Sequence, residues 1–233
     1  MIAPARLPPS THPDHRAGLD SAAPARVLRP VGLVWLDGSG PSRGASAPTE
    51  LRYPSGSLVL VGGLPGAGKT TLLERVALPD HAAVLDTEML RSRWARWLGR
   101  RVASRRLAPI VHIEHGLKVA GRLLRDSGPV VVHLRATRSL QRRLLARVAR
   151  LRGRECHLIF LHVPPAVADL SQRRRGRRVR SGVLEREWAD ASRLLARLRA
   201  AEPPANPLRE EGYASCVVLD RPAASSLRAI TFG

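Results

Sequence analysis

Short apolar runs alternate along the chain with longer segments whose apolar residues recur three and four positions apart. The runs are typical of buried strands, and the longer segments of amphipathic helices. Strands are expected at residues 31–36, 58–61, 82–85, 130–134, 157–163 and 216–219. Helices are expected at residues 68–78, 87–98, 110–125, 139–151, 166–175, 181–198 and, as a turn or short helix, 222–228. This alternation predicts an α/β fold in which right-handed crossovers build a parallel sheet covered on both faces.

The first part of the chain has a different composition. Residues 1–30 mix Pro, Ala, Arg, Ser and His without an apolar period, which predicts a disordered tail. Residues 31–56 are expected to form a leader strand and a loop, and residues 57–233 a single α/β domain. A hairpin is expected at residues 51–61, around the turn-forming sequence at 54–56.

A glycine-rich segment between a predicted strand and a predicted helix matches the pattern G-x-x-x-x-G-K-[ST] at every fixed position. Glycines let consecutive N–H groups of such a loop point at one anion, and the helix N-terminus adds partial positive charge. We expect the Lys69 ammonium to reach the β- and γ-phosphates of a nucleotide and the Thr70 hydroxyl to bind Mg²⁺. The expected nucleotide-binding residues are Gly63, Leu64, Pro65, Gly66, Ala67, Gly68, Lys69, Thr70 and Thr71.

The basic residues of the chain support this role for Lys69. Of the 39 Lys and Arg residues, only Lys69 and Lys118 are lysines. A chain that uses Arg at almost every basic position has kept Lys where a compact ammonium on a flexible stem is needed.

The formal net charge of +20 predicts anionic partners, such as nucleic acid, an anionic membrane surface or phosphorylated metabolites. A solvated basic surface without a dedicated partner is the alternative.

The two cysteines and the apolar segments indicate the compartment. Cys156 and Cys216 each stand beside an apolar run, so we expect buried thiols in a reducing compartment, with neither a disulfide nor a zinc site. No apolar stretch approaches the length needed to span a bilayer, and the N-terminus lacks the apolar region of a signal peptide. We therefore expect a cytoplasmic protein that does not bind to membranes through a spanning helix.

An acidic residue stands where ligands of parallel sheets bind, at the carboxyl end of a strand. Asp86 follows the predicted strand at 82–85, and we expect it to accept a proton from an attacking hydroxyl group near the γ-phosphate. Arg91, on the helix that follows, is expected to hold an anionic group of the substrate. An ordinary helix N-cap is the alternative for Asp86. Glu88 is the second candidate for the base.

Arginines flank Gly176 on both sides, beyond the fourth strand of the expected domain. We expect this segment to be a mobile lid whose arginines stabilise the transferring phosphoryl group and exclude water. Arg175 and Arg177, next to the glycine, are the leading candidates, followed by Arg173. A solvated basic loop is the alternative.

With these residues the chain resembles the P-loop kinase-like ATP-binding proteins grouped with the AAA-type ATPases, a set close to zeta toxins, polynucleotide kinases and chloramphenicol phosphotransferase. The resemblance covers residues 58–198 and rests on residues 63–71, on Asp86 with Arg91, and on Arg175-Gly176-Arg177. It implies a five-stranded parallel sheet in the order 2-3-1-4-5 and a base role for Asp86. The family's usual acidic residue on the third strand is replaced by His133 and Leu134. Because Mg²⁺ prefers oxygen ligands, we expect it to be held by Thr70, water and the nucleotide, or catalysis to be slow.

The sequence thus favours phosphoryl transfer from ATP or GTP, with Mg²⁺, to a hydroxyl of a small molecule or of a nucleic acid end. Two other functions stay open. One is an ATPase whose nucleotide state controls a partner. The other is a basic nucleic-acid-binding protein that retains nucleotide binding, which the missing acidic residue on the third strand favours. The oligomeric state is not indicated by the sequence.

Overall fold

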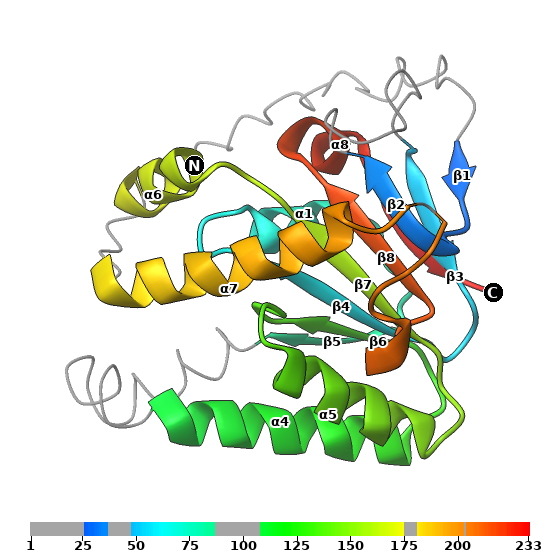
Figure 1. Cartoon of the computed structure of the whole chain (residues 1–233). Helices are drawn as coiled ribbons and strands as arrows, with labels where there is room; N and C mark the ends of the chain where they lie inside the picture. Colours follow the sequence, from blue (N-terminus) through cyan, green and yellow to red (C-terminus); the bar gives the residue numbers. More distant parts are fainter. Residues whose placement is uncertain (1–25, 37–47, 87–107, 175–180, 203) are drawn as a thin grey trace, which may run out of the picture.

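The computed structural model describes residues 26–36, 48–86, 108–174, 181–202 and 204–233. A sheet of six strands lies at its centre, in the order β2-β8-β7-β4-β6-β5, and all neighbouring strands are parallel (Figure 1). The strands are β2 (Gly32–Leu36), β4 (Leu58–Gly63), β5 (Ala83–Asp86), β6 (Val130–His133), β7 (Cys156–Leu161) and β8 (Ser215–Leu219). The central strands β4 and β7 are buried at every position, as their uninterrupted apolar runs predict.

Five of these strands confirm the expected order. Numbered from β4, the first strand of the expected domain, the series β5-β6-β4-β7-β8 is the order 2-3-1-4-5. The expected strand count was too low by one, because β2 adds a sixth strand at the free edge of β8. The two strands pair from Gly32 opposite Ser215 to Leu36 opposite Leu219. The leader strand therefore pairs with the main sheet.

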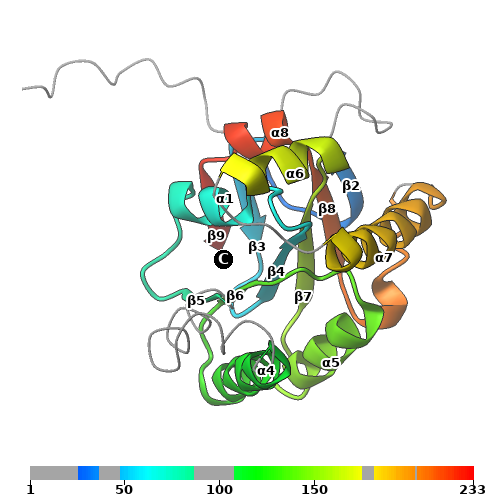
Figure 2. The same cartoon turned by 90° about the vertical axis from the view of Figure 1, so that its left-hand side faces the viewer.

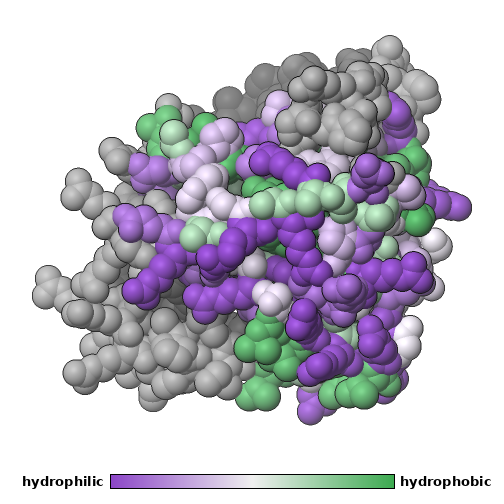
Figure 3. Space-filling view, viewed as in Figure 1, coloured by the Kyte–Doolittle hydropathy of each residue, from purple (hydrophilic) through white to green (hydrophobic). Residues whose placement is uncertain are grey.

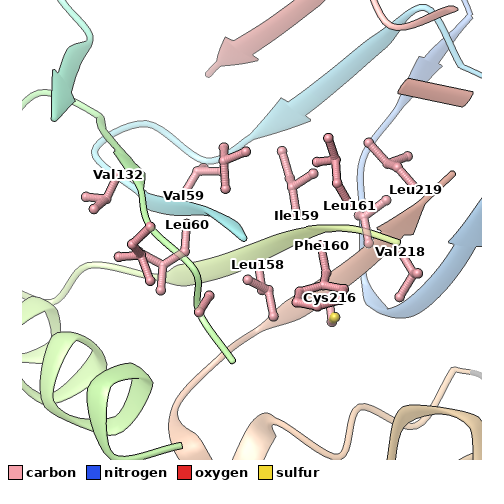
Figure 4. Close-up of a cluster of buried hydrophobic side chains, with 14 of the residues drawn as sticks. Val59, Leu60, Val132, Leu158, Ile159, Phe160, Leu161, Cys216, Val218 and Leu219 are labelled. Atoms are coloured by element: carbon pink, nitrogen blue, oxygen red, sulfur yellow. The ribbon is translucent and has the colours of Figure 1, made fainter. Parts of the chain in front are cut away.

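Helices cover both faces of the sheet. Figure 2 shows α4, α5 and α7 on one face and α1 and α8 on the other. The helices are α1 (Lys69–Arg75), α4 (Ala108–Arg125), α5 (Ser139–Arg150), α6 (Pro165–Arg174), α7 (Ser181–Arg199) and α8 (Arg221–Ser226), with a short 3-10 helix η1 (Arg209–Glu211). Side chains of the central strands alternate between the two faces: Val59 and Ile159 point to one side, and Leu60 and Phe160 to the other (Figure 4). Each face thus supplies an apolar surface for its own helices.

A second, smaller parallel sheet corrects the expected hairpin. It has the order β1-β3-β9 and consists of β1 (Val27–Leu28), β3 (Glu50–Tyr53) and β9 (Ala229–Phe232). The prediction of a hairpin at residues 51–61 was wrong, because β3 pairs with β9, which is distant in the sequence, and not with β4. The buried side chains Leu51, Tyr53 and Ile230 explain the pairing, since they give the small sheet an apolar face against the domain.

The small sheet also explains why the first helix is shorter than expected. Helix α1 ends at Arg75, and Val76 is already extended. Ala77 then forms a bridge with Ala229 at the start of β9. The Ala77 N–H donates to the Arg228 carbonyl at 2.7 Å, and its carbonyl accepts from the Ile230 N–H at 3.0 Å. Backbone pairing with a distant strand therefore ends the helix before the proline that was expected to stop it.

Both cysteines lie where the sequence placed them, buried on β7 and β8. Burial raises the pKa of the Cys156 and Cys216 thiols to about 12, so neither is a thiolate at neutral pH.

Among the helices in the described ranges, none is long and apolar enough to cross a membrane.

A buried charged cluster connects α5, α7 and η1. The Arg142 guanidinium donates to both carboxylate oxygens of Glu211, at 2.7 and 2.9 Å, and is only 2% exposed. Its remaining donor contacts the carbonyls of Ala136 and Thr137 at 2.7 and 2.9 Å. Arg197 of α7 donates to Glu211 at 2.7 Å. The cluster therefore holds the loop after β6 in place through several hydrogen bonds.

The cluster predicts that substitution of two adjacent glutamates lowers the free energy of unfolding by very different amounts. Glu211→Ala removes the acceptor of two guanidinium groups and leaves the buried Arg142 charge unpaired, so it should lower the free energy of unfolding by about 3–5 kcal/mol. Glu210→Ala is the control, because this side chain is 83% exposed and lies 3.3 Å from Arg197. This variant should lower the free energy of unfolding by at most about 1 kcal/mol. Urea denaturation measures both values. Equal losses for the two variants would contradict the importance of the cluster.

Candidate active site

The loop between β4 and α1 needs glycine for two different reasons. Gly63, Gly66 and Gly68 have φ angles of 138°, 88° and 101°, a region that other residues rarely adopt. A Cβ on Gly63 would lie 2.6 Å from the Leu161 carbonyl oxygen, and one on Gly66 would lie 2.4 Å from that of Ala168. A Cβ on Gly68 would meet open space. The loop is thus curled tightly against β7 and α6 on one side and is open at the start of α1.

The Lys69 ammonium lies inside this curl. The side chain is 8% exposed, and Nζ donates to the carbonyls of Gly63 at 2.8 Å and Leu64 at 2.9 Å. Leu64 and Ala67 are buried and joined by a turn in which the Ala67 N–H donates to the Leu64 carbonyl at 3.1 Å. The loop therefore has an apolar base in the core and a positive charge at its centre. The order of strand, glycine loop and helix is the one that the sequence motif requires, and the nucleotide-binding roles of residues 63–71 stay predictions.

Thr70 and Thr71 follow at the start of α1. Thr70 is half-buried and Thr71 is exposed. No side-chain cap is formed at the start of this helix, because Gly68 is the N-cap residue. The first N–H groups of a helix lack partners within the helix, so this end favours negative charge.

The loop after β6 packs directly on the glycine loop between β4 and α1, which we call the phosphate loop (residues 63–68). The Gly63 N–H donates to the Arg135 carbonyl at 2.9 Å, and the Leu134 N–H donates to the Val61 carbonyl at 3.2 Å. A Cβ on Gly62 would lie 2.7 Å from the Ala136 Cβ, which explains why the strand ends in two glycines. Ala136 itself has a φ of 53°, the one positive value at a residue other than glycine among those described. The sequence places the residues after Leu134 at the ligand-binding edge of the sheet, but it carries no local sign that they pack on Gly62 and Gly63.

An ion pair fixes the same loop from the side of α7. The guanidinium of Arg135 donates to the carboxylate of Glu187, which is buried. Because Arg135 is a charged residue on a loop, its sequence context carried no sign of this contact. The loop is thus held by Glu187 at one residue and by Arg142 at the next two.

Asp86 is the last residue of β5, at the same edge of the sheet as the phosphate loop. It pairs with His133 of β6, which in turn pairs with Val61 of β4. Asp86 is therefore separated from the phosphate-loop strand by two ordinary strand spacings, about 10 Å. The backbone position fits the expectation for a residue near the γ-phosphate. The roles of Asp86 as base and of His133 as a substitute for an acidic residue stay predictions.

Several predicted site residues lie outside the described residues. These are Glu88, Arg91, Arg175 and Arg177, and the side chain of Arg173 is likewise not described. Helix α6, which precedes residues 175–180, contacts the phosphate loop: a Cβ on Gly66 would lie 3.2 Å from Cγ of Gln172, whose side chain is buried. The sequence of this helix carries no local sign that Gln172 is a neighbour of the loop. The lid itself stays a prediction.

The loop geometry predicts that Gly66→Ala lowers the free energy of unfolding more than Gly153→Ala does. Both residues have positive φ, 88° and 63°, so each alanine should cost about 1–2 kcal/mol of backbone strain. Only the alanine at position 66 also meets a backbone carbonyl, whereas nothing lies within 4 Å of a Cβ on Gly153. Urea denaturation of both variants should show the larger loss for Gly66→Ala. Losses of the same size would mean that α6 moves away freely from the loop.

Solved structures similar to this chain include several kinases at low sequence identity. A gluconokinase from Sinorhizobium meliloti is 18% identical over 74% of this chain and 92% of its own, with a TM-score of 0.42. A sugar kinase from Janibacter sp. is 18% identical over 73% of this chain and 89% of its own, with a TM-score of 0.42. The tunicamycin resistance protein of Deinococcus radiodurans is 20% identical over 58% and 80%, with a TM-score of 0.41. Curated protein sequences contain no significant match.

The sequence model of one protein family matches most of the domain. The family is described as an AAA domain, and the match covers residues 58–198, well over half of the 233 residues. The matched segment begins with the first residue of β4, includes the phosphate loop and ends within α7. It agrees with the extent of the resemblance inferred from the motifs. The strand order, the glycine loop around Lys69 and this match together place the chain in the AAA domain family, with the fold of a P-loop kinase-like, nucleotide-binding protein.

Proposed function

We propose that the protein is a cytoplasmic phosphotransferase that moves the γ-phosphoryl group of ATP to a hydroxyl of a small molecule or of a nucleic acid end. One observation carries the proposal: the strand that begins the glycine loop and the strand that ends in Asp86 finish at the same edge, aligned through His133. A phosphate-binding loop alone would serve any nucleotide-binding protein. An aspartate whose backbone lies at the same edge would supply a base for an acceptor hydroxyl.

The loop fits the phosphates of a nucleotide. Gly68 leaves open space at the start of α1, and the Lys69 ammonium already lies inside the curl. Its two carbonyl contacts can be exchanged for charge-assisted contacts to phosphate oxygens, which are stronger. The ammonium would then neutralise charge on the β- and γ-phosphates without any further burial of the side chain.

Magnesium fits the Thr70 hydroxyl better than any carboxylate cluster. In the part of the chain that the structure describes, no group of three or more His, Cys, Asp and Glu side chains can hold a metal ion. Mg²⁺ is commonly held by few protein oxygens together with water and substrate phosphates. We infer that Thr70 supplies the protein ligand. A metal ion held by Thr70 would supply positive charge that offsets the charge of the phosphates.

The remaining roles follow from the position of each residue in the chain. Asp86 would remove the proton of the acceptor hydroxyl, and Arg91 would hold an anionic group of the acceptor. Arg175 and Arg177 would contact the transferring phosphoryl group, since they directly follow a helix that packs against Gly66. Their contacts would strengthen as negative charge spreads over the equatorial oxygens.

A second function is favoured by the charge of the chain. With a net charge of +20 and a histidine at the end of β6, the protein would bind nucleic acid and keep nucleotide binding without efficient transfer. An ATPase that controls a partner is the third alternative, and it would not need Asp86 at the edge of the sheet.

Substitution of the two lysines tests nucleotide binding. Lys69→Ala should weaken Mg·ATP binding by roughly 10- to 100-fold, because it removes charge-assisted contacts to phosphate. Lys69→Arg should also fail, since the planar guanidinium is too large for the curl. Lys118→Ala is the matched control: this lysine is exposed on α4 and pairs with Glu114 at 2.8 Å, and its loss should leave the affinity unchanged. Titration calorimetry measures all three. Unchanged affinity of Lys69→Ala would refute the site.

An amide at position 86 separates phosphoryl transfer from nucleotide binding. Asp86→Asn keeps the shape and any N-cap but cannot take a proton, so transfer should fall by about 10²- to 10⁴-fold with little change in ATP affinity. Transfer is followed with γ-labelled ATP and a panel of acceptors that includes 5′-hydroxyl RNA and DNA. Asp80→Asn, at an exposed residue before β5, is the control. Equal transfer by Asp86→Asn and the unmodified protein would exclude the base role. Absence of transfer by either would favour the nucleic-acid-binding alternative.

A further inference from the structure

A groove of about 710 Å³ lies between α7 and the start of α5. Its volume falls within the usual range of small-molecule sites, about 300–1,000 Å³. The surface over α7, on the side that faces α5, is largely hydrophilic (Figure 3). The groove is lined by Thr137, Arg138, Ser139, Leu140, Arg142, Arg186, Ala189, Asp190, Arg193, Leu194 and Arg197.

The wall of the groove carries an excess of positive charge. Five of its residues are arginines, and Asp190 is the one acidic residue among them. Asp190 accepts from two of the arginines, Arg138 at 3.4 Å and Arg193 at 2.5 Å. Glu211, outside the groove, accepts from two more, Arg142 and Arg197. Glu210 lies 3.3 Å from Arg197 as well. Three carboxylates thus pair with four of the five guanidinium groups, which leaves an excess of positive charge that favours an anionic ligand.

Part of this wall is already rigid. Arg142 is held by Glu211 and by the carbonyls of residues 136 and 137. Arg197 donates to Glu211 and also to the Pro207 carbonyl at 2.6 Å. These two arginines therefore fix the shape of the wall through contacts within the protein. The exposed arginines of the groove, which can reach a ligand, are Arg138, Arg186 and Arg193.

The groove begins next to the phosphate loop. Thr137 and Arg138 form one end of it, and they directly follow the residues whose backbone packs on Gly62 and Gly63. Helix α5 starts at this end, with no side-chain cap and no acidic residue in its first turn. One end of the groove therefore lies at the carboxyl edge of the sheet, beside the loop that packs on Gly63, and the other end lies at Arg197, next to η1.

We propose that this groove binds phosphate groups of the acceptor, so that the acceptor is itself a phosphate ester with a free hydroxyl group. The proposal rests on the proposed phosphotransferase function and names the chemical class of its acceptor. Guanidinium groups bind phosphate oxygens in pairs, which suits a wall of arginines. Leu140, Leu194 and Ala189 offer apolar contacts to a sugar or a base between the phosphates. The phosphates can belong to a nucleic acid backbone or to a small metabolite.

Charge reversal inside and outside the groove tests the proposal. Arg186→Glu with Arg193→Glu changes two exposed arginines of the groove. Arg143→Glu with Arg147→Glu changes two exposed arginines of α5 that do not line it, and so alters the net charge by the same amount. Binding of fluorescent 5′-hydroxyl single-stranded RNA and of adenosine 3′-phosphate is measured without ATP. Arg138→Glu serves as a second groove variant, and circular dichroism confirms that each variant is folded.

We expect the groove pair to weaken binding by at least about tenfold and the control pair to change it little. Loss for RNA alone assigns the groove to nucleic acid, and the salt dependence of log K should then become shallower by about 1.4 for two phosphates. Loss for adenosine 3′-phosphate as well assigns it to a phosphate monoester. The proposal is overturned if the groove pair and the control pair lose affinity equally, or if no groove variant loses affinity for either ligand. Because ATP is omitted, this result is independent of whether Asp86→Asn abolishes transfer.

Discussion

The close approach of two backbones at the carboxyl ends of β4 and β6 fixes the position of the glycine loop relative to the end of β6. Gly62 and Gly63 let the loop after β6 come within hydrogen-bond distance, with the Gly63 N–H on the Arg135 carbonyl at 2.9 Å. A Cβ on Gly62 would lie 2.7 Å from the Ala136 Cβ and would push this loop away, whereas one on Gly63 would meet the Leu161 carbonyl of β7. This contact places the phosphate loop beside the end of β6, and the strand register then places Asp86 at the same edge. One constraint thus brings the backbone of the glycine loop and the backbone of Asp86 to the same edge.

Charge enters this arrangement at two levels. Inside, Lys69 and Arg142 are buried cations that contact backbone carbonyls and so stabilise loops. Outside, exposed arginines on α5 and α7 make the surface potential more positive. The network around Glu211 connects the two levels, because Arg142 and Arg197 belong to both the buried cluster and the groove. The net charge of +20 therefore has at least one defined place in the fold.

Local patterns predicted the centre of the fold well. The apolar runs located the five strands from β4 to β8, and the motif located the loop whose geometry surrounds Lys69. The missed parts were those in which partners are distant in sequence. The pairing of β3 with β9 joins residues about 180 positions apart, which no local pattern records. The groove was missed for the same reason, since Arg138 and Arg193 belong to helices that meet only after folding.

The sequence by itself determined the strand, the glycine loop and the helix that would hold phosphate, because these depend on backbone conformation and on neighbours a few residues away. It also determined which segments are buried, because apolar periodicity shows that a face is covered. It did not determine what covers that face. The tertiary structure decided that β2 joins β8, that Glu211 receives Arg142 and Arg197, and that five arginines line one groove. Those pairings depend on contacts between elements distant along the chain, which form only when the whole sheet has assembled.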